Sequence, residues 1–387
     1  MLKKLKLKDT SVVVVFLGIL LAVFIINLVK EDDALSFSER RKLAQFPEIT
    51  VEAVLNKESM DGFDNYSVDQ IAFRENYRRL KAMFDINVWL KSDNNAIFVV
   101  GDQVFKTEYP KNENSARQLC NIINYVYGQF LTGMNVHYAA IPDKNYYLGD
   151  THHLIMDYPA YAAFIRENIL AEIGEIYLFG ALSLDCYYMT DSHWRQDRLG
   201  AVVDAIAEGM GSALRFDAGG YSREQYAPFY GVYYGQSALN VAPDEITYLV
   251  NDATKNSAVT SIEQPGAVLE VYDTSVLGGM DSYNMFMHGP QAIIRADNPG
   301  NTSGRELIII RDSYASSLSP LFLSGYSAVT LVDLRYIRPD LLSQFIEFTD
   351  QDVLFLFSTT LFNNSDSVKA PPQDAFVSPF LARATIP

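Results

Sequence analysis

The sequence predicts an α/β protein in which helices flank a mainly parallel sheet, with a β-rich insertion and one N-terminal transmembrane helix. Three observations lead to this prediction. Short apolar runs of strand length alternate with longer segments of helical periodicity, an order that is typical of a parallel sheet. The alternation stops at about residues 216–303, where Tyr, Gly and turn residues are frequent. A long apolar run lies near the N-terminus.

The apolar run at residues 11–29 would be about 28 Å long as a helix, which is enough to cross the hydrocarbon core of a bilayer. Four lysines precede it and three acidic residues follow it, a bias that keeps the N-terminus in the cytoplasm. A cleaved signal peptide is the alternative, but the run is longer than the usual apolar region of such a peptide, and no clear cleavage site follows. We expect residues 1–33 to be a cytoplasmic stub and an uncleaved anchor, with the rest of the chain outside the cytoplasm.

The composition of the 387 residues restricts the class of protein. Apolar residues make up 49% of the chain, which indicates a globular protein, and the net charge of −16 argues against nucleic acid as a partner. The only cysteines, Cys120 and Cys186, do not form a disulfide framework, and their spacing leaves open whether they are bonded or free. The chain contains no cysteine–histidine cluster, Walker motif or GxGxxG motif, so we expect neither a metal nor a cofactor.

After the anchor, residues 34–90 are predicted to form a juxtamembrane helical lead-in. Apolar residues such as Phe73, Leu80 and Phe84 recur there at helical spacing, which predicts helix over 52–90.

The remaining residues, 91–387, are predicted to form the α/β domain with its insertion. Its strands are short apolar runs bounded by turn residues, and its helices have apolar residues along one face. We expect strands at 97–100, 136–141, 176–179, 307–310, 329–332 and 353–357, and helices at 115–130, 158–173, 195–214, 316–323 and 339–348. Asn114 or Ser115 is expected to cap the first of these helices, and Pro142 ends the second strand. Two alternating segments in the insertion, 246–250 and 268–272, are also predicted to be strands.

Two short motifs contain the chemical groups of an activated serine nucleophile. Asp191 and His193 are two residues apart, so on an extended segment their side chains would point the same way. Ser313 directly follows the apolar strand at 307–310. Because reactive groups gather at the carboxyl ends of parallel strands, the two motifs could meet at one edge of the sheet. An imidazole could then accept the proton of the hydroxyl, and a carboxylate could orient that imidazole. Each motif alone is also explained by ordinary helix capping.

The sequence Asp191-Ser192-His193-Trp194, followed by Leu199-Gly200-Ala201, resembles the DHHW protein family and its relatives, the AlgJ and AlgX type of alginate O-acetyltransferase. These relatives have an SGNH-hydrolase-like domain. The resemblance continues, in order along the chain, through residues 38–43, 73–75, 142–144, 231–234, 311–315, 320–322 and 332–336. It therefore covers nearly all of the part expected outside the cytoplasm.

The resemblance implies that Asp191, His193 and Ser313 form a catalytic triad. Ordinary SGNH esterases have the serine first, so a simple esterase fits this order less well. Two positions depart from the family pattern: Ser192 replaces the first histidine, and Arg311 replaces the glycine of a GDS signature. The backbone amides of Ser313 and Gly289 are candidate oxyanion donors, and no asparagine can be assigned to the SGNH role.

Several neighbouring residues are candidates for substrate binding. Lys144 follows the strand at 136–141 and would either face the substrate or lie in a solvated loop. Tyr233 and Tyr234 belong to an aromatic-rich segment that could stack on sugar rings or pack within the insertion. Arg311 and Tyr314 flank the serine motif. Trp194 is expected to pack beneath His193 and fix its orientation.

The resemblance implies O-acetylation of a cell-surface or secreted polysaccharide at the bacterial cytoplasmic membrane, by way of an acyl-serine intermediate. It also implies a multispanning acyltransferase of the MBOAT type as the acyl-donor partner. Two alternatives remain open from the sequence. One is a carbohydrate esterase, and the other is a cell-envelope protein that binds polysaccharide without catalysis.

Overall fold

The computed structural model describes residues 7–149 and 152–372. The chain divides into two compact units. The N-terminal unit consists of the residues up to Asn95 together with Tyr234–Asn240, and the α/β unit consists of the remainder. The first six residues, with three of the four lysines that precede the apolar run, lie outside the described part.

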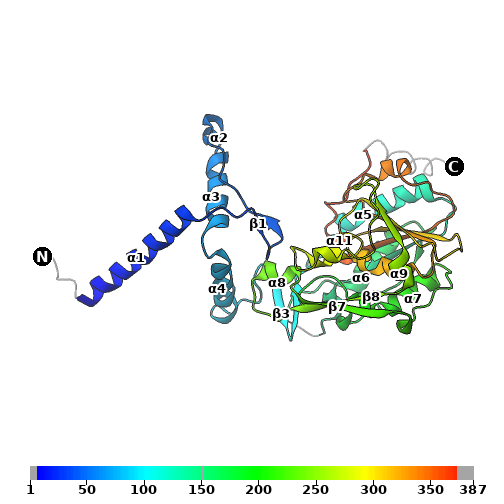
Figure 1. Cartoon of the computed structure of the whole chain (residues 1–387), viewed down its shortest axis with the longest axis horizontal. Helices are drawn as coiled ribbons and strands as arrows, with labels where there is room; N and C mark the ends of the chain where they lie inside the picture. Colours follow the sequence, from blue (N-terminus) through cyan, green and yellow to red (C-terminus); the bar gives the residue numbers. More distant parts are fainter. Residues whose placement is uncertain (1–6, 150–151, 373–387) are drawn as a thin grey trace. The chain divides into compact units, whose positions relative to one another are not determined.

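The N-terminal unit begins with one long apolar helix (Figure 1). Within it, Thr10–Val29 is long and apolar enough to cross a membrane, and none of this span is buried against protein. The helix predicted over 52–90 is divided into three helices. Lys57 and Phe73 lie at the two breaks, and their left-handed backbone angles interrupt the helix. The elements of this unit are α1 (Leu7–Val29), β1 (Leu35–Ser36), β2 (Arg41–Lys42), α2 (Val51–Leu55), α3 (Glu58–Gln70) and α4 (Arg74–Asn87).

A seven-stranded sheet forms the centre of the α/β unit, which confirms the predicted fold class. Its spatial order is β6 (Gly174–Glu175), β5 (Val136–Ile141), β13 (Asp352–Ser358), β11 (Glu306–Arg311), β12 (Ala328–Val332), β10 (Ile293–Asp297) and β9 (Ala258–Ser261). The first five strands are parallel, and β10 and β9 continue the sheet in antiparallel pairs. The carboxyl ends of the five parallel strands therefore lie at one edge.

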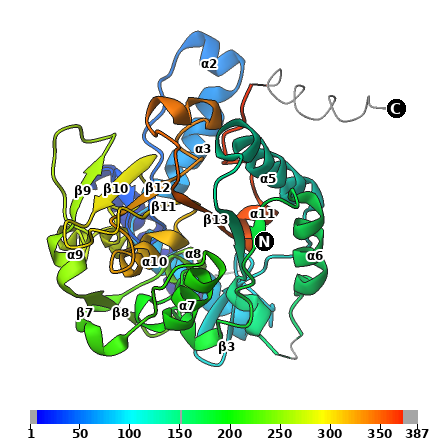
Figure 2. The ribbon, with the colours of Figure 1, turned by 90° about the vertical axis from the view of Figure 1, so that its right-hand side faces the viewer.

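Helices cover both faces of this sheet (Figure 2). On β11, Ile308 and Ile310 pack into one core, while Leu307 and Ile309 pack into the other. The first core includes α5 (Glu113–Val126), α6 (Tyr158–Asn168) and α11 (Thr359–Asn363), and the second includes α7 (Gly200–Gly209) and α10 (Tyr314–Leu318). The alternation is what a central strand buried on both faces requires.

The region predicted as an insertion is only partly separate from the sheet. Its strands β7 (Ser222–Phe229) and β8 (Asp244–Val250) form a hairpin of their own, but β9 and β10 belong to the central sheet. The predicted strand at 268–272 is reduced to isolated bridges. Two further short helices lie in this region, α8 (Val232–Ser237) and α9 (Asp252–Asn256). Outside it, a small separate hairpin pairs β3 (Ile97–Val100) with β4 (Gln103–Lys106).

Three further local predictions were wrong. Asn112 caps α5 in place of Asn114 or Ser115, because its side chain accepts the Ser115 amide. Residues 176–179 form no strand, and residues 339–348 contain only a 3-10 helix, Pro339–Gln344. Both cysteines are buried free thiols, which settles the question that their spacing left open.

Candidate active site

The structure brings Asp191, His193 and Ser313 into one hydrogen-bonded chain. The Oδ1 atom of Asp191 lies 2.6 Å from Nδ1 of His193, and Nε2 of His193 lies 2.7 Å from Oγ of Ser313. The carboxylate is fully buried, whereas the imidazole and the hydroxyl are partly exposed. This is the geometry in which an imidazole can take a proton from the hydroxyl while the carboxylate fixes its tautomer.

The Asp191–His193 pair lies in a tight loop and not on an extended segment. Tyr187 and Trp194 pair as an antiparallel bridge, and the amide of Tyr188 donates to the carbonyl of His193. The chain therefore reverses direction at Asp191. Its carboxylate accepts the backbone amide of His193 at 3.0 Å as well as the ring N–H, so the turn itself holds the two side chains together.

A second segment fixes the other carboxylate oxygen. Oδ2 of Asp191 accepts the amide of Val232 at 2.7 Å, and the neighbouring Gly231 amide donates to Oγ1 of Thr190. Gly231 has room for no side chain, since a Cβ there would lie 2.3 Å from the Thr190 carbonyl oxygen. The buried charge thus receives three N–H donors, which offset the cost of removing it from water.

The segment that leads into the loop is held by two buried charged side chains. Asp244 accepts the amides of Met189 and Thr190 at 2.6 and 2.7 Å. The ammonium of Lys144 donates to the carbonyls of Tyr188 and Met189, both at 2.9 Å. The N–H and C=O groups of this irregular segment are therefore both hydrogen-bonded, as a buried loop requires.

The prediction that Lys144 faces substrate or solvent was wrong. Its side chain is buried, and its ammonium also lies over the rings of Phe105 and Tyr233 at 5.4 and 5.3 Å. Burial lowers the pKa of Lys144 to about 7, against the opposing influence of Asp191 and Asp244. Lys144 acts on the site through the backbone and does not touch the reacting atoms.

Ser313 lies where β11 ends and α10 begins, as the sequence predicted. The adjacent Asp312 fixes this junction, because its carboxylate accepts the amide of Tyr314 at 3.1 Å and that of Ser358 at 2.8 Å. Ser358 is the last residue of β13, so Asp312 connects the carboxyl ends of two neighbouring strands. The position of the hydroxyl is therefore set by the sheet.

Aromatic side chains hold the imidazole and connect it to α10. The ring of Tyr283 stacks on His193 at a centroid distance of 4.0 Å, which is the position that was expected for Trp194. Trp194 instead donates its indole N–H to the Tyr314 carbonyl and to Ser317. The hydroxyl of Tyr283 also bonds to Ser317, at 2.8 Å. Trp194 thus fastens the loop to the helix that follows the serine.

A small depression of about 190 Å³ opens at the triad. Most of the residues that line it are of polar type, and the full set is Ser192, His193, Asp312, Ser313, Tyr314, Arg335, Ser358, Thr360, Leu361 and Asn364. Arg335, whose guanidinium pairs with Asp333 at 2.6 Å, and Asn364 were missing from the sequence-based set. The only signal for Arg335 was its place in the family-like segment 332–336.

The remaining predicted residues are distributed differently. Arg311 is fully buried and donates to the Gly289 carbonyl at 2.9 Å and to Ser316 at 3.0 Å, so it does not reach the depression. The Gly289 amide donates to the carbonyl of Phe286, which leaves it engaged within the protein. Tyr314 lines the depression, and its hydroxyl donates to the Ser192 carbonyl.

The two adjacent tyrosines belong to different units. Tyr233 is buried beside Ile97 and Val104 in the α/β unit, which is the packing role left open by the sequence. Tyr234 lies in the N-terminal unit, where its hydroxyl accepts a hydrogen bond from Arg79 at 3.1 Å.

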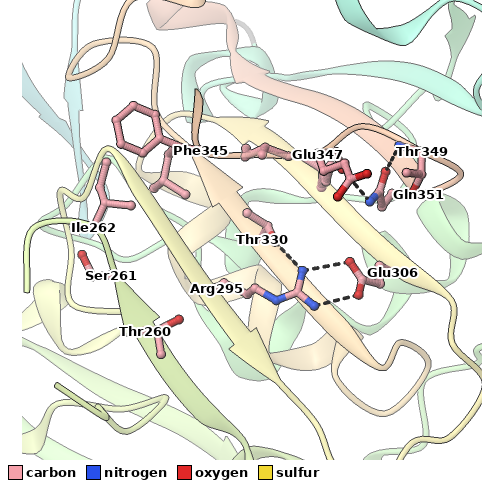
Figure 3. A pocket seen from close by; sticks show the side chains of 13 residues that line it. Thr260, Ser261, Ile262, Arg295, Glu306, Thr330, Phe345, Glu347, Thr349 and Gln351 are labelled. Atoms are coloured by element: carbon pink, nitrogen blue, oxygen red, sulfur yellow. Dashed lines mark hydrogen bonds and ion pairs between the residues drawn. The ribbon is translucent and has the colours of Figure 1, made fainter. Parts of the chain in front are cut away.

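A larger depression of about 410 Å³ lies on the sheet face formed by β9 to β12 and contains no triad residue (Figure 3). Two hydrogen bonds join the guanidinium of Arg295 to Glu306 (Figure 3). A third joins it to Asp297. Across residues 7–149 and 152–372, no cluster of side chains has the composition of a metal site.

The fold is similar to that of several solved structures. No family model and no curated protein matches the chain. A DHHW family protein from Eubacterium siraeum superimposes with a TM-score of 0.56 at 18% identity, over 71% of this chain and 94% of that protein. PatB1 of Bacillus cereus, in a structure with a sulfonyl adduct, gives 0.56 at 17% identity, over 69% and 95%. The O-acetyltransferase domain of Pseudomonas putida AlgJ gives 0.43 at 13%, over 70% and 92%. The relation to DHHW proteins that the sequence indicated is confirmed at the level of the fold.

The role of Lys144 can be tested by replacing it with methionine. Lys144→Met leaves the Tyr188 carbonyl buried without its donor and leaves the Met189 carbonyl with the Val104 amide alone, so we expect the free energy of unfolding to fall by about 2 kcal/mol. Denaturant titration measures this loss. Lys255→Met, at an exposed lysine, is the control and should change the stability little. Equal stability of the two variants would show that the ammonium does not hold the loop.

Glu108 should make the stability depend on pH. Burial and, to a smaller extent, the nearby Asp143 carboxylate raise the pKa of Glu108 from 4.5 to about 7. The folded chain then binds more protons than the unfolded chain between these values, so this contribution to stability is lost as the pH rises from about 4.5 to about 7. We expect Glu108→Gln to raise the melting temperature at pH 8 relative to the wild type, with a smaller difference at pH 5. Glu224→Gln, at an exposed glutamate, should show no such pH dependence.

Proposed function

We propose that this protein is an extracytoplasmic, membrane-anchored O-acyltransferase that uses Ser313 as its nucleophile. The observation that supports this most directly is the continuous chain from Asp191 through His193 to Ser313, with separations of 2.6 and 2.7 Å. An imidazole fixed on one side by a buried carboxylate and bonded on the other side to a serine hydroxyl is the arrangement that activates serine for acyl transfer.

The proposed reaction has two halves that use the same three side chains. Oγ of Ser313 attacks the acyl carbonyl of the donor while His193 takes the hydroxyl proton. His193 then returns this proton to the leaving group as the donor bond breaks, which leaves an acyl-serine. In the second half His193 takes a proton from the acceptor hydroxyl, which attacks the acyl-serine and restores Ser313. Asp191 stabilises the charged imidazole in both halves.

The backbone amide of Ser313 is the oxyanion donor that the site supports best. It lies at the N-terminus of α10, and it makes no hydrogen bond to any described residue. The small volume of the depression suits an acetyl-sized acyl group. The polar side chains of Arg335 and Asn364 at its edge suit a hydroxylated acceptor such as a polysaccharide.

The location and the partners form part of the same proposal. Helix α1 would stay in the cytoplasmic membrane as a single-pass anchor, with the catalytic unit outside. The acyl donor would be delivered by a multispanning acyltransferase of the MBOAT type, as the family resemblance implies.

Replacing the nucleophile tests the triad. We expect Ser313→Ala, and likewise His193→Ala, to lower the rate of acyl transfer by about three orders of magnitude or more, while the melting temperature stays close to that of the wild type. A sulfonyl fluoride should label the wild type at Ser313 and should fail to label Ser313→Ala. Ser303→Ala, at an exposed serine near the opposite end of β11, is the control. Full transfer activity in Ser313→Ala would overturn the assignment of the nucleophile.

A second experiment separates acyl transfer from hydrolysis. The purified full chain is incubated with an activated acetyl ester and an oligosaccharide acceptor, and mass spectrometry measures both products. We expect the acetylated oligosaccharide to form at the expense of free acetate as the acceptor concentration rises. Acetate alone, at every acceptor concentration, would favour an esterase. Oligosaccharide binding without either product would favour a binding protein.

A further inference from the structure

Helix α4 of the N-terminal unit has its charged face turned inward and its apolar face turned outward. Ala82 and Asp85 are the buried residues of this helix, each about 1% exposed. The opposite side carries a continuous stripe at spacings of four, three, four and four residues, with exposed fractions between 40% and 56%. The stripe consists of Phe73, Tyr77, Leu80, Phe84 and Val88. An amphipathic helix surrounded by water has the reverse arrangement.

Ion pairs fix this orientation of α4. Arg74 pairs with Glu39 at 2.5 Å, and Lys81 and Lys91 pair with the buried Asp85 at 2.7 and 2.8 Å. These bonds come from the inner face and the flanks of the helix. Rotating the stripe inward would therefore break a charged network and leave a buried carboxylate unpaired, which is costly.

Arg78 adds a further attachment on the same inner side. Its guanidinium pairs with Glu75 at 3.0 Å and donates to the Gly235 carbonyl at 2.6 Å. A Cβ at Gly235 would overlap the Ser38 carbonyl, so the inner face is tightly packed. These contacts therefore keep the stripe facing away from the interior of this unit.

The stripe begins at the level where the membrane-spanning helix ends. The amide of Ala72, directly before Phe73, donates to Oδ1 of Asn27 at 2.7 Å. Asn27 is in the last turn of α1, only two residues before Val29. The side-chain amide of Gln70 makes two hydrogen bonds with the backbone of Asp33, both at 2.9 Å. The first residue of the stripe is therefore attached close to the boundary between hydrocarbon and water.

We infer that the stripe on α4 lies in the outer interface of the lipid bilayer, as a monotopic contact beside the anchor. Its composition suits that environment, because aromatic side chains favour the headgroup region. The stripe continues beyond the helix with Trp89 and Leu90, which are 64% and 80% exposed.

The charge of the helix supports lipid as the occupant. Within Arg74–Asn87 there are four cationic side chains, Arg74, Arg78, Arg79 and Lys81, and two acidic ones, Glu75 and Asp85, whereas the whole chain has a net charge of −16. Arg74, Arg78 and Lys81 are paired with carboxylates on the inner side and the flanks, so no excess of negative charge accompanies the apolar face that would meet anionic lipid headgroups. The inference rests on the part of the proposed function in which α1 stays in the membrane.

The two tryptophans make the test direct, because Trp194 is buried in the α/β unit and Trp89 is exposed. The full chain is reconstituted in vesicles of phosphatidylcholine and phosphatidylglycerol whose acyl chains carry bromine, which quenches only tryptophans in contact with lipid. We expect quenching of one emission component, and its loss in Trp89→Phe. Aqueous iodide should quench that component weakly. Strong iodide quenching with no effect of bromine would overturn the inference. Protection of Trp89 from both quenchers that increases with protein density would also overturn it, because a second copy of the chain would then cover the stripe.

Nitroxide labels give an independent reading and a matched control. The native cysteines are buried, so a label can be directed to Leu80→Cys on the stripe or to Leu154→Cys, an exposed leucine of the α/β unit. The label at position 80 should be more accessible to oxygen than to a water-soluble nickel complex, and the label at 154 should show the opposite. Equal accessibilities at the two positions would overturn the inference. Resistance of the vesicle-bound protein to alkaline extraction reports separately on the anchor, so failure of the anchor and failure of the stripe are distinguishable.

Discussion

The buried carboxylate of Asp191 is the interaction on which the arrangement of the site depends. A charge removed from water must be compensated by hydrogen bonds, and here the donors come from the His193 amide, the His193 ring and the Val232 amide. The same three bonds close the loop, orient the imidazole and join two segments about forty residues apart in the chain. The bonds that compensate the buried charge are therefore the same bonds that assemble the site.

The loop around Asp191 contains no regular secondary structure, yet almost every backbone group leading into it is paired. Asp244 accepts the amides on one side, and Lys144 donates to the carbonyls on the other. These two buried charges also lie near enough to influence one another, since Asp244 opposes the lowering of the pKa of Lys144. An irregular segment can thus hold a reactive side chain as firmly as a strand does, provided that its polar backbone is satisfied from both sides.

The parts of the site that the sequence predicted are those with a local origin. Ser313 followed from an apolar strand and the rule for parallel sheets, and the proximity of Asp191 to His193 followed from their spacing, although the loop that joins them is not extended. The region that contains β9 and β10 was assigned to an insertion, without these two strands, because a local pattern does not specify pairing partners. Lys144 was misplaced for a similar reason, since the carbonyls that hold it are more than forty residues away in the chain. No local pattern reveals such a partner.

Helix α4 is a second case in which a local sequence pattern did not predict what the helix packs against. The spacing of Phe73, Leu80 and Phe84 correctly predicted a helix, and the usual inference from such spacing is that the apolar face points toward a core. That inference assumes water as the surrounding solvent. Here Glu39 provides a partner for Arg74 on the inner side, so the charged face is the one that packs. A helix that packs its charged face and exposes its aromatic side chains is favoured where the outer face meets a medium less polar than water. The orientation of α4 is therefore itself evidence about the environment in which this unit folds.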